Sequence, residues 1–482
     1  MTIVSQDSKE NSGVAANYQD DTVESSNNRR HDVIVIGSGV AGLTAAKQLS
    51  KVLDNDASIL VLEANPNHIG GRTYTHVEDD HHIDMGATWV HGGKKHGQPI
   101  AVMAEAIGCK ISDRLDEFED DVFFDLDQNG KVIPLREVER KEVELERNIE
   151  KAKKYARSVE RKEGRHISIQ EALRHVDPTI EEDAIRQYFV RQNIEFDYGG
   201  PASTISGADF DHDEEYKGGD FIPVEGYKPI VDSLAKGLDI ELGVQVQTIE
   251  YDTEGVTLHT NRGLYYADKV ICTIPLGVLK SGAVSFEPAL SESKQTAIER
   301  LGWGAVNKVG LLFDDVFWQK DTTGFGMVGG KETPMVQYIL NKYAFTQMPM
   351  LEAYVVGEHA KNMATQSDED VLDRILSELS VAFGRSKENL RASIVKTYIQ
   401  RWNTEEFVKG AYSYASPGTV EEDFEAFEYS LLRVVFFAGE HTIADYRGTV
   451  HGAFLSGRRA ANDVLEAMNR KLSKMKVAHL VG

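Results

Sequence analysis

The chain is poor in cysteine: it has two, Cys109 and Cys272, among 482 residues. They stand far apart in the sequence and match none of the spacings that metal-binding motifs use. This excludes a small scaffold stapled by disulfides and a zinc site built on cysteines. We therefore predict that both cysteines are reduced residues of the core, as is usual in a reducing compartment, and that the protein has no metal site.

Basic residues are also few, with 53 lysines and arginines against 77 acidic residues and a net charge of −24. Such a protein repels nucleic acid and anionic membranes, so we expect neither as a partner. The same field attracts polycations, although acidity that serves solubility alone is more common. The sequence leaves the oligomeric state open.

Long apolar runs are missing too. No segment reaches the length of a membrane span, and residues 1–30 are polar and acidic, without the apolar stretch of a signal peptide. The last five residues, A-H-L-V-G, are not the peroxisomal signal S-K-L. We expect a cytoplasmic or nuclear protein whose first 30 residues form a disordered arm.

The first chemical motif follows this arm. A β-branched run, D-V-I-V-I, leads into G-S-G-V-A-G and a helix-forming stretch, and the next apolar run, S-I-L-V-L-E, ends at Glu63. In this order Gly37 permits a tight turn, Gly39 lets the backbone approach a pyrophosphate, and Gly42 allows helix and strand to pack closely. The helix N-terminus attracts phosphates, and Glu63 accepts hydrogen bonds from ribose hydroxyls. This unit predicts a site for FAD or NAD, and its acid disfavours NADP.

Two later segments extend this site. Gly71 and Arg72, in G-G-R, permit a second close backbone approach and offer charge-assisted hydrogen bonds to a pyrophosphate; an ordinary surface turn is the alternative. Near the C-terminus V-V-F-F-A-G-E ends at Gly439 and Glu440, and Thr449 opens another helix. A second helix N-terminus suits an anionic reduced flavin, whereas simple packing of a strand on a helix is the alternative.

The order of elements predicts an α/β fold whose parts are interleaved along the chain. Strand-like runs at 244–251, 256–259 and 269–274 extend the first unit, and 138–162 is typical of a long helix with a solvated, charged face. We therefore predict a dinucleotide-binding domain in three pieces, with an α+β substrate-binding domain inserted twice. The predicted limits are 31–103, 221–290 and 403–470 for the first domain, 104–220 and 291–402 for the second, and 471–482 for a C-terminal tail.

Further motifs give these segments a family likeness. They are L-E-A with G-G-R-T-Y-T, D-M-G-A-T-W-V-H-G, T-I-P-L-G-V-L-K, G-W-G-A-V-N-K-V, K-G-A-Y-S-Y, and F-A-G-E-H-T with T-V-H-G-A-F-L-S-G. With this set, in order from about residue 31 to 466, the chain resembles the flavin amine oxidase superfamily of polyamine oxidases, monoamine oxidases and the catalytic domain of lysine-specific histone demethylases. The likeness is greatest to intracellular polyamine and spermine oxidases. It implies FAD on a discontinuous, Rossmann-like domain of the glutathione reductase type.

The resemblance assigns the surroundings of the flavin residue by residue. Lys308 matches the lysine that the family places near flavin N5 through a water, and Tyr412 matches the aromatic residue in front of the ring. Thr449 stands where many relatives carry a second aromatic residue, so the aromatic cage is half open. Ala411 replaces the cysteine that binds FAD covalently in monoamine oxidases, so the implied FAD is non-covalent. The implied contacts to FAD are Gly37, Gly39, Gly42, Glu63, Gly71, Arg72, Val246, Trp402, Phe407, Gly439, Glu440, Thr449 and Val450.

Without the family, two of these residues have plain alternatives. A lysine between apolar residues, such as Lys308 in V-N-K-V, is either at a strand edge or buried and functional with a shifted pKa. Tyr412 is equally compatible with an ordinary place in the core.

Two further features concern the substrate. His91, in T-W-V-H-G, stands where intracellular spermine and acetylpolyamine oxidases carry histidine, and we interpret it as a substrate contact rather than as a structural histidine. An acidic run either lines the approach of a cationic substrate or is a solvated loop. This run comprises Asp209, Asp211, Asp213, Glu214 and Glu215.

These inferences predict a FAD-dependent oxidase of spermine, spermidine or their acetylated forms, with O2 as the second substrate. A hydride passes from the amine α-carbon to flavin N5, the imine hydrolyses to an aldehyde, and reoxidation yields H2O2. A methyl-lysine histone demethylase is the nearest alternative, although the chain is short for the demethylases' N-terminal module and long helical insertion. Oxidation of another amine and a non-catalytic flavin-binding scaffold are the others. The sequence gives neither the polyamine nor the carbon, exo or endo to the secondary nitrogen, that is oxidised.

Overall fold

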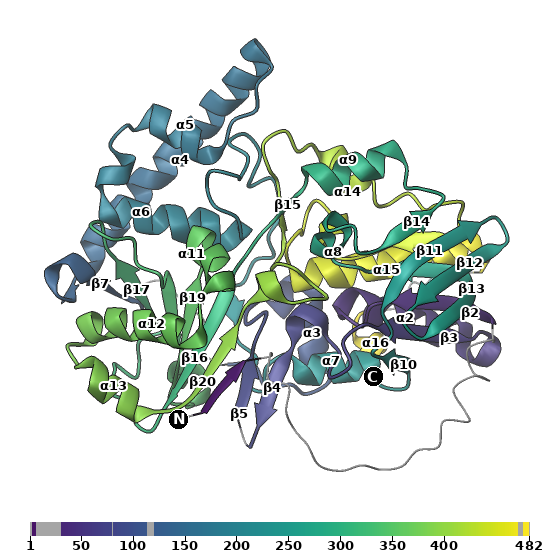
Figure 1. The fold of residues 1–482 in the computed structure, drawn as a ribbon, viewed down its shortest axis with the longest axis horizontal. Helices are drawn as coiled ribbons and strands as arrows, with labels where there is room; N and C mark the ends of the chain where they lie inside the picture. Colours follow the sequence, from purple (N-terminus) through teal and green to yellow (C-terminus); the bar gives the residue numbers. More distant parts are fainter. Residues whose placement is uncertain (1, 6–29, 80, 113–119, 471–475, 482) are drawn as a thin grey trace.

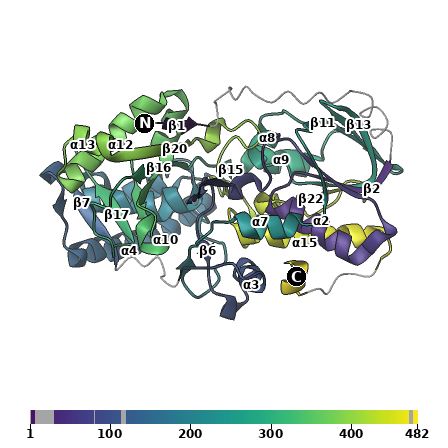
Figure 2. The ribbon, with the colours of Figure 1, turned by 90° about the horizontal axis from the view of Figure 1, so that it is seen from below.

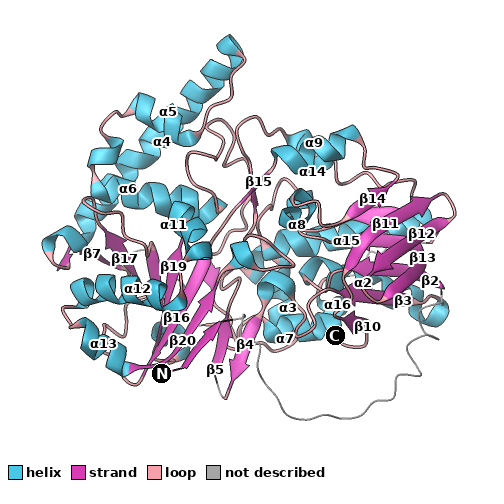
Figure 3. Cartoon of the chain, viewed as in Figure 1, coloured by secondary structure: helices cyan, strands magenta, loops and turns pink. Residues whose placement is uncertain are grey.

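Two large sheets lie side by side, each with its own helices (Figures 1 and 3). The computed structural model describes residues 2–5, 30–79, 81–112, 120–470 and 476–481. The view from below shows the same separation of the two halves (Figure 2).

The first sheet contains the predicted dinucleotide-binding unit. Strand β2 (Arg30–Ile36) lies between β3 (Ile59–Glu63) and β13 (Gly263–Cys272), and all three are parallel. Continuous apolar runs form these strands because both faces of a central parallel strand are buried. The other strands of this sheet are β10 (Asp239–Leu242), β12 (Gly255–Thr260), β11 (Val246–Asp252), β14 (Ser285–Glu287) and β22 (Val435–Phe437).

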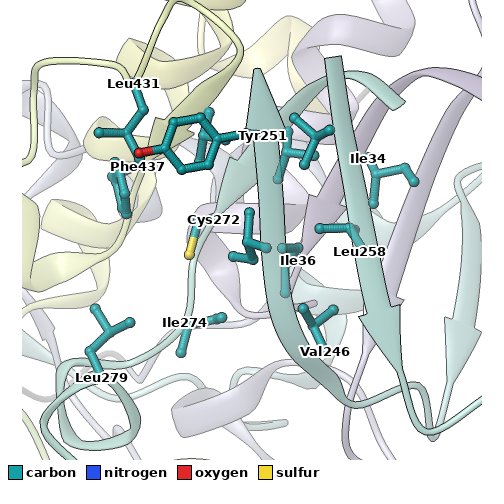
Figure 4. Packing of buried hydrophobic residues seen from close by; sticks show 14 of the residues in the cluster. Ile34, Ile36, Val246, Tyr251, Leu258, Cys272, Ile274, Leu279, Leu431 and Phe437 are labelled. Carbon is teal, nitrogen blue, oxygen red and sulfur yellow. The ribbon is translucent and has the colours of Figure 1, made fainter. Parts of the chain in front are cut away.

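The two faces of β2 enter different cores. Val33 and Val35 pack with helices α2 (Val40–Leu53) and α15 (Val450–Ala467). Ile34 and Ile36 pack on the other face with residues of β11, β12 and β13 (Figure 4). Strands from three distant parts of the chain thus share one sheet, which confirms the predicted α/β class with a discontinuous dinucleotide fold.

The second sheet carries the strand of the candidate lysine. Strand β16 (Asn307–Phe313) is buried at every position and runs antiparallel to β19 (Met350–Val355) and β20 (Ile394–Gln400). Helix α12 (Asp368–Phe383) supplies buried apolar residues to the core on one face. The sheet also contains β18 (Tyr338–Asn341), β17 (Gly324–Val328), β7 (Val122–Asp125) and β8 (Lys131–Val132).

A helical layer adjoins this sheet. Helix α4 (Leu135–Glu163) matches the long helix predicted at 138–162. One stripe of it is buried with α5 (Ile169–Val176) and α6 (Ala184–Val190), and much of the remaining surface is charged and exposed. The predicted solvated face is therefore present, and the buried stripe docks the helix on its neighbours.

The two chain ends differ from their predictions. Thr2–Ser5 form strand β1, which pairs in parallel with β20, and Arg30 begins β2. The predicted disordered arm, 1–30, was therefore wrong for these five residues; residues 6–29 lie outside the described residues. Within the predicted tail, Ala478–Val481 form helix α16, and its Leu480 is fully buried against α3 (Pro99–Ala106) and α7 (Lys228–Ala235). Backbone pairing orders Thr2–Ser5, and burial of the Leu480 side chain orders the C-terminal helix. The domain limits stay predictions.

Cys109 and Cys272 are both free and buried, as predicted. No helix within the described ranges is long and apolar enough to span a membrane. In the same part of the chain, no group of histidine, cysteine and acidic residues is arranged to hold a metal ion. The remaining elements are α8 (Leu276–Lys280), α9 (Glu292–Arg300), α10 (Lys342–Thr346), α11 (Gly357–Asn362), α13 (Lys387–Ser393), α14 (Glu421–Glu425), β4 (Thr75–Glu78), β5 (His81–Asp84), β6 (Val90–His91), β9 (Asp220–Phe221), β15 (Gly302–Trp303) and β21 (Ser413–Tyr414).

Candidate active site

The glycine loop joins β2 to the N-terminus of α2. Gly37 has a φ of 101°, which suits glycine, and its N–H donates to the Leu62 carbonyl of the neighbouring strand. A Cβ on Gly42 would lie 2.0 Å from the Gly37 carbonyl oxygen, whereas a Cβ on Gly39 would meet nothing within 4 Å. Gly42 is therefore needed for packing of the helix on the loop, and Gly39 borders open space.

Glu63 closes the same loop at the end of β3. Its Oε2 accepts hydrogen bonds from the Ser38 N–H at 2.7 Å and from the Ser38 hydroxyl at 2.6 Å, and its Oε1 accepts from the Asn65 N–H at 2.8 Å. These bonds hold an acid beside the glycine turn, as the ribose contact requires.

One cavity of about 800 Å³ brings the predicted residues together. Gly42 is the exception, because it lies behind the loop and packs against it. The predicted residues that line the cavity are Gly37, Gly39, Glu63, Gly71, Arg72, His91, Val246, Lys308, Trp402, Phe407, Tyr412, Gly439, Glu440, Thr449 and Val450.

Arg72 and Glu440 form an ion pair in the wall of this cavity. The Arg72 Nη1 donates to Glu440 Oε1 at 2.7 Å and to the Ala411 carbonyl at 2.8 Å, and its guanidinium stacks 4.9 Å from the Trp303 ring centroid. Burial raises the pKa of Glu440, but the charges of Arg72 and His441 and the hydrogen bonds from Arg72 and Ser413 together outweigh it, so the net shift is downward. Sequence reasoning missed Trp303, although it stands in the quoted motif G-W-G.

Lys308 is a buried lysine at the second position of β16, an interior strand between β19 and β20, and not a strand-edge lysine. Its side chain is 4% exposed, and its Nζ donates to the carbonyls of Asp84 at 2.6 Å and Gly86 at 3.0 Å and to the Thr88 hydroxyl at 2.5 Å. Burial lowers its pKa, and the carboxylate of Glu352 opposes that shift. No local sequence signal pointed to Glu352, because its strand β19 lies more than 40 residues further along the chain.

Tyr412 is held rigidly at the cavity. Its hydroxyl donates to the Phe196 carbonyl, and its ring packs so closely on Gly199 that a Cβ there would lie 2.8 Å from a ring carbon. Burial raises its pKa, so it stays a neutral phenol. The place of Tyr412 in front of the flavin stays a prediction.

Thr449 has a structural task besides its place in the cavity wall. It is the N-cap of α15: its hydroxyl accepts from the Gly452 N–H at 2.9 Å and donates to the Tyr446 carbonyl at 2.7 Å. The hydroxyl therefore uses its donor for the preceding loop and an acceptor site for the first turn of the helix. The catalytic part assigned to Thr449 stays a prediction.

The predicted acidic run divides into two parts. Asp209 and Asp211 pair with Arg157 at 3.4 Å and Lys153 at 2.5 Å, both on α4, and do not line the cavity. Neither alternative fits these two acids, because they are partly buried and pair with α4 instead of lining the cavity or lying in a solvated loop. Asp213, Glu214 and Glu215 do line the cavity, and among the described residues five acids that the sequence did not indicate join them; these are Asp121, Asp197, Asp220, Glu405 and Glu406.

His91 lies within this acidic wall. Its Nδ1 is 2.9 Å from Asp220 Oδ2. Desolvation lowers the pKa of His91. The hydrogen bond and charge of Asp220, with the charges of Asp197 and Glu215, raise this pKa by a larger amount, so the net shift is upward. A histidine held by an acid at the cavity is compatible with the predicted substrate contact, which stays a prediction.

Comparison with known proteins identifies the family. The profile of the flavin-containing amine oxidoreductases matches residues 40–465. The chain belongs to this family. It is 33% identical over 451 residues to polyamine oxidase 2 of Arabidopsis thaliana, a match that covers 90% of the chain and 88% of that protein. Polyamine oxidase 4 of Oryza sativa subsp. japonica is 33% identical over 445 residues, with 89% and 88% covered.

Histone demethylase homologues are about as similar. The chain is 32% identical over 460 residues to lysine-specific histone demethylase 1 homolog 2 of Arabidopsis thaliana, which covers 92% of the chain but only 60% of that longer protein. A solved structure of putrescine oxidase bound to putrescine shares the fold, with a TM-score of 0.71 and 21% identity over 91% of this chain and 99% of that one.

The cofactor of this flavin-containing amine oxidoreductase is FAD. The residues fit it: open space borders Gly39 at the N-terminus of α2, Glu63 ends the adjacent strand, and the N-terminus of α15 faces the same cavity. These are the groups that a pyrophosphate, a ribose and an anionic ring would need.

Alanine substitutions at Gly39 and Gly42 should have different effects: the first on FAD binding and the second on folding stability. Gly39 has a φ of −69°, so Gly39→Ala should leave the apoprotein's melting temperature unchanged while a methyl group enters the open space and weakens FAD binding by about tenfold or more. Gly42→Ala should instead cost about 1–3 kcal/mol of folding stability, because its Cβ overlaps the Gly37 carbonyl. Thermal unfolding and FAD titration of both apoproteins measure this, and equal FAD affinity in wild type and Gly39→Ala would contradict it.

Proposed function

We propose that this protein oxidises polyamines such as spermine and spermidine, with FAD as electron acceptor and O2 as the final oxidant. One observation carries the choice of a polycation: ten acids of the described residues line the cavity that also holds Lys308 and Tyr412, and five of them come from residues 197–220. These five are Asp197, Asp213, Glu214, Glu215 and Asp220.

Few cationic groups offset these acids. Asp213 pairs with Arg447 at 3.2 Å, and Asp220 pairs with His91. Burial raises the pKa of Asp197 to about 7; the other acids of the wall add to this rise, and His91 opposes it. A wall that resists taking up more negative charge favours a ligand that brings positive charge.

The chemistry at the other end of the substrate requires a neutral nitrogen. Bound FAD supplies a hydride acceptor that passes two electrons to O2, giving H2O2. An ammonium has no lone pair to support hydride loss from its α-carbon, so the amine beside Tyr412 must be deprotonated while the distal amines stay cationic. The imine formed on the substrate then adds water and splits into an aldehyde and an amine.

Lys308 and Tyr412 have different roles at the amine that is oxidised. The Tyr412 ring, fixed by the Phe196 carbonyl and by Gly199, positions the amine and excludes water from it. Lys308 places a buried positive charge at the cavity wall, and this charge stabilises the negative charge that develops during reoxidation. Ala411 has no nucleophilic atom, so the FAD is non-covalent.

Demethylation of a histone tail is the second candidate, because the acidic wall also suits a basic peptide and the demethylase homologues are equally similar. Peroxide release should be measured with spermine, spermidine, their acetylated forms, putrescine and a methylated lysine peptide, and the products weighed by mass spectrometry. We expect release with the polyamines. Peroxide release with the methylated peptide alone would replace our proposal by the second candidate. If no amine reduces the flavin absorbance in the absence of oxygen, a non-catalytic flavin-binding scaffold is favoured.

Replacing the lysine tests the catalytic assignment. Lys308→Met should retain FAD, but the rate constant of reoxidation by O2 should fall by roughly 10²–10³-fold, the usual size of losing one stabilising group. Stopped-flow absorbance of the reduced enzyme mixed with O2 gives this rate constant. Wild-type kinetics in the variant would show that Lys308 has no part in turnover.

Asp197 predicts a pH dependence of substrate binding. Because its raised pKa lies at about 7, its carboxylate is present above that pH and lost below it, so KM for spermine should fall as pH rises from 6 to 8. Asp197→Asn should raise KM at pH 8 by about fivefold, the equivalent of one partly exposed ion pair of ~1 kcal/mol, and flatten this dependence. An unchanged KM profile in the variant would remove Asp197 from the substrate site.

A further inference from the structure

A closed ring of polar contacts joins Lys308, Thr88 and Tyr354, which line the cavity, to Glu352 behind its wall. The Lys308 Nζ contacts the Thr88 hydroxyl at 2.5 Å, Thr88 contacts the Tyr354 hydroxyl at 3.0 Å, and Tyr354 donates to Glu352 Oε2 at 3.3 Å. The same Oε2 returns to Lys308 at 3.6 Å. Lys342, on α10, approaches the other oxygen, Glu352 Oε1, at 3.7 Å.

The charged members of this group are withdrawn from solvent. Lys342 is 1% exposed, and Glu352 and Asp84 are fully buried. Neither Glu352 nor Lys342 lines the cavity, so neither touches the cofactor or substrate. Burying a second lysine and a glutamate is costly, so their presence beside Lys308 calls for a reason other than stability.

The directions of the hydrogen bonds give that reason. An ionised carboxylate only accepts, so the Tyr354 hydroxyl, which burial keeps protonated by raising its pKa, donates to Glu352. The Thr88 hydroxyl must then donate to Tyr354, which leaves the Thr88 oxygen to accept from Lys308. With the two carbonyls of Asp84 and Gly86, Lys308 meets three acceptors, which match the three N–H donors of an ammonium.

We propose that Glu352 is a positioning residue that keeps Lys308 protonated through Tyr354 and Thr88, and that Lys342 limits this effect by holding the second carboxylate oxygen. The proposal rests on the proposed function for the use of Lys308 in reoxidation. The ionisable groups that face Lys308 are Asp84 from β5, Glu352 and Tyr354 from β19, and Lys342 from α10.

The two partners should therefore act in opposite directions. In Glu352→Gln the amide can donate to Tyr354, which reverses the ring and leaves Lys308 with a hydroxyl donor instead of an acceptor, so the neutral amine becomes favoured. Lys342→Met removes a neighbouring positive charge, so the ammonium of Lys308 becomes more stable. Tyr354→Phe breaks the ring by losing one hydroxyl and should resemble Glu352→Gln.

The test uses the FAD-loaded enzyme reduced by light, so that no amine is needed. Reoxidation by O2 should slow as pH rises through the pKa of Lys308. We expect the inflection to move down by about one pH unit or more in Glu352→Gln and Tyr354→Phe, and up in Lys342→Met. The pH titration of the bound flavin's absorbance is the second readout and should show the same displacements without any turnover.

A matched control is Glu378→Gln. Glu378 is a buried glutamate of the same half of the protein, and it accepts from the Met335 and Val336 N–H groups and pairs with Arg374 rather than with the ring. Its substitution should leave the inflection in place.

Two results would overturn the proposal. In the first, the pH inflection does not move in either Glu352→Gln or Tyr354→Phe. In the second, the inflection moves in the same direction in Glu352→Gln and Lys342→Met. If Glu352→Gln fails to fold, Tyr354→Phe alone decides, because it deletes only one oxygen atom. Failure of the proposed function is separate, since it would show as absence of peroxide with amines while the photoreduced enzyme still reports on the ring.

Discussion

The buried ion pair between Arg72 and Glu440 joins parts of the chain that are 368 residues apart. Arg72 also holds the Ala411 carbonyl and stacks on Trp303, and Glu440 accepts from the Ser413 hydroxyl and the Gly448 N–H. One pair of charges thus connects the G-G-R turn to the segments that carry Tyr412 and the start of α15. Breaking it would leave an uncompensated buried charge, which typically costs about 3–5 kcal/mol. The cavity wall depends on it.

Charge is distributed unevenly around this cavity. Five acids from residues 197–220 line one part of it, and Lys308 adds a buried positive charge to the same wall. Each buried ion costs several kcal/mol unless it is paired and hydrogen-bonded, which explains why Lys308 lies among three acceptors and near Glu352. The net charge of −24 describes the whole chain, and only the arrangement of side chains makes it a feature of the site.

Much of the fold and of the cavity lining could be predicted from the sequence because the signals are local. Gly37, Gly39 and Gly42 are required by a turn and two close approaches that lie within six residues, and Glu63 ends the next strand. The family likeness extended this to Lys308. Asp197 and Asp220 were missed because nothing in their local sequence distinguishes an acid that faces a cavity from one that faces water.

The two chain ends and the acidic run show the opposite limit. Thr2–Ser5 begin a segment that is mostly polar and acidic, yet they pair with β20, an interaction that depends on a partner about 390 residues away. Asp211 and Asp213 stand two residues apart, but one pairs with Lys153 on α4 and the other lines the cavity. Whether such a segment is ordered, or such an acid faces the cavity, depends on its position relative to distant elements, and composition alone does not give that position.

By itself, the sequence determined that this chain binds a dinucleotide on a strand–turn–helix unit, because steric limits on glycine and the period of apolar residues act over a few positions. Its motifs, taken together, determined the family. Only the tertiary structure decided which charges share one cavity and that Glu352, Tyr354 and Lys342 surround the lysine. Electrostatic and hydrogen-bond interactions act over a few ångströms in space, whatever the separation along the chain, so the pairing of strands β16 and β19 had to be known first.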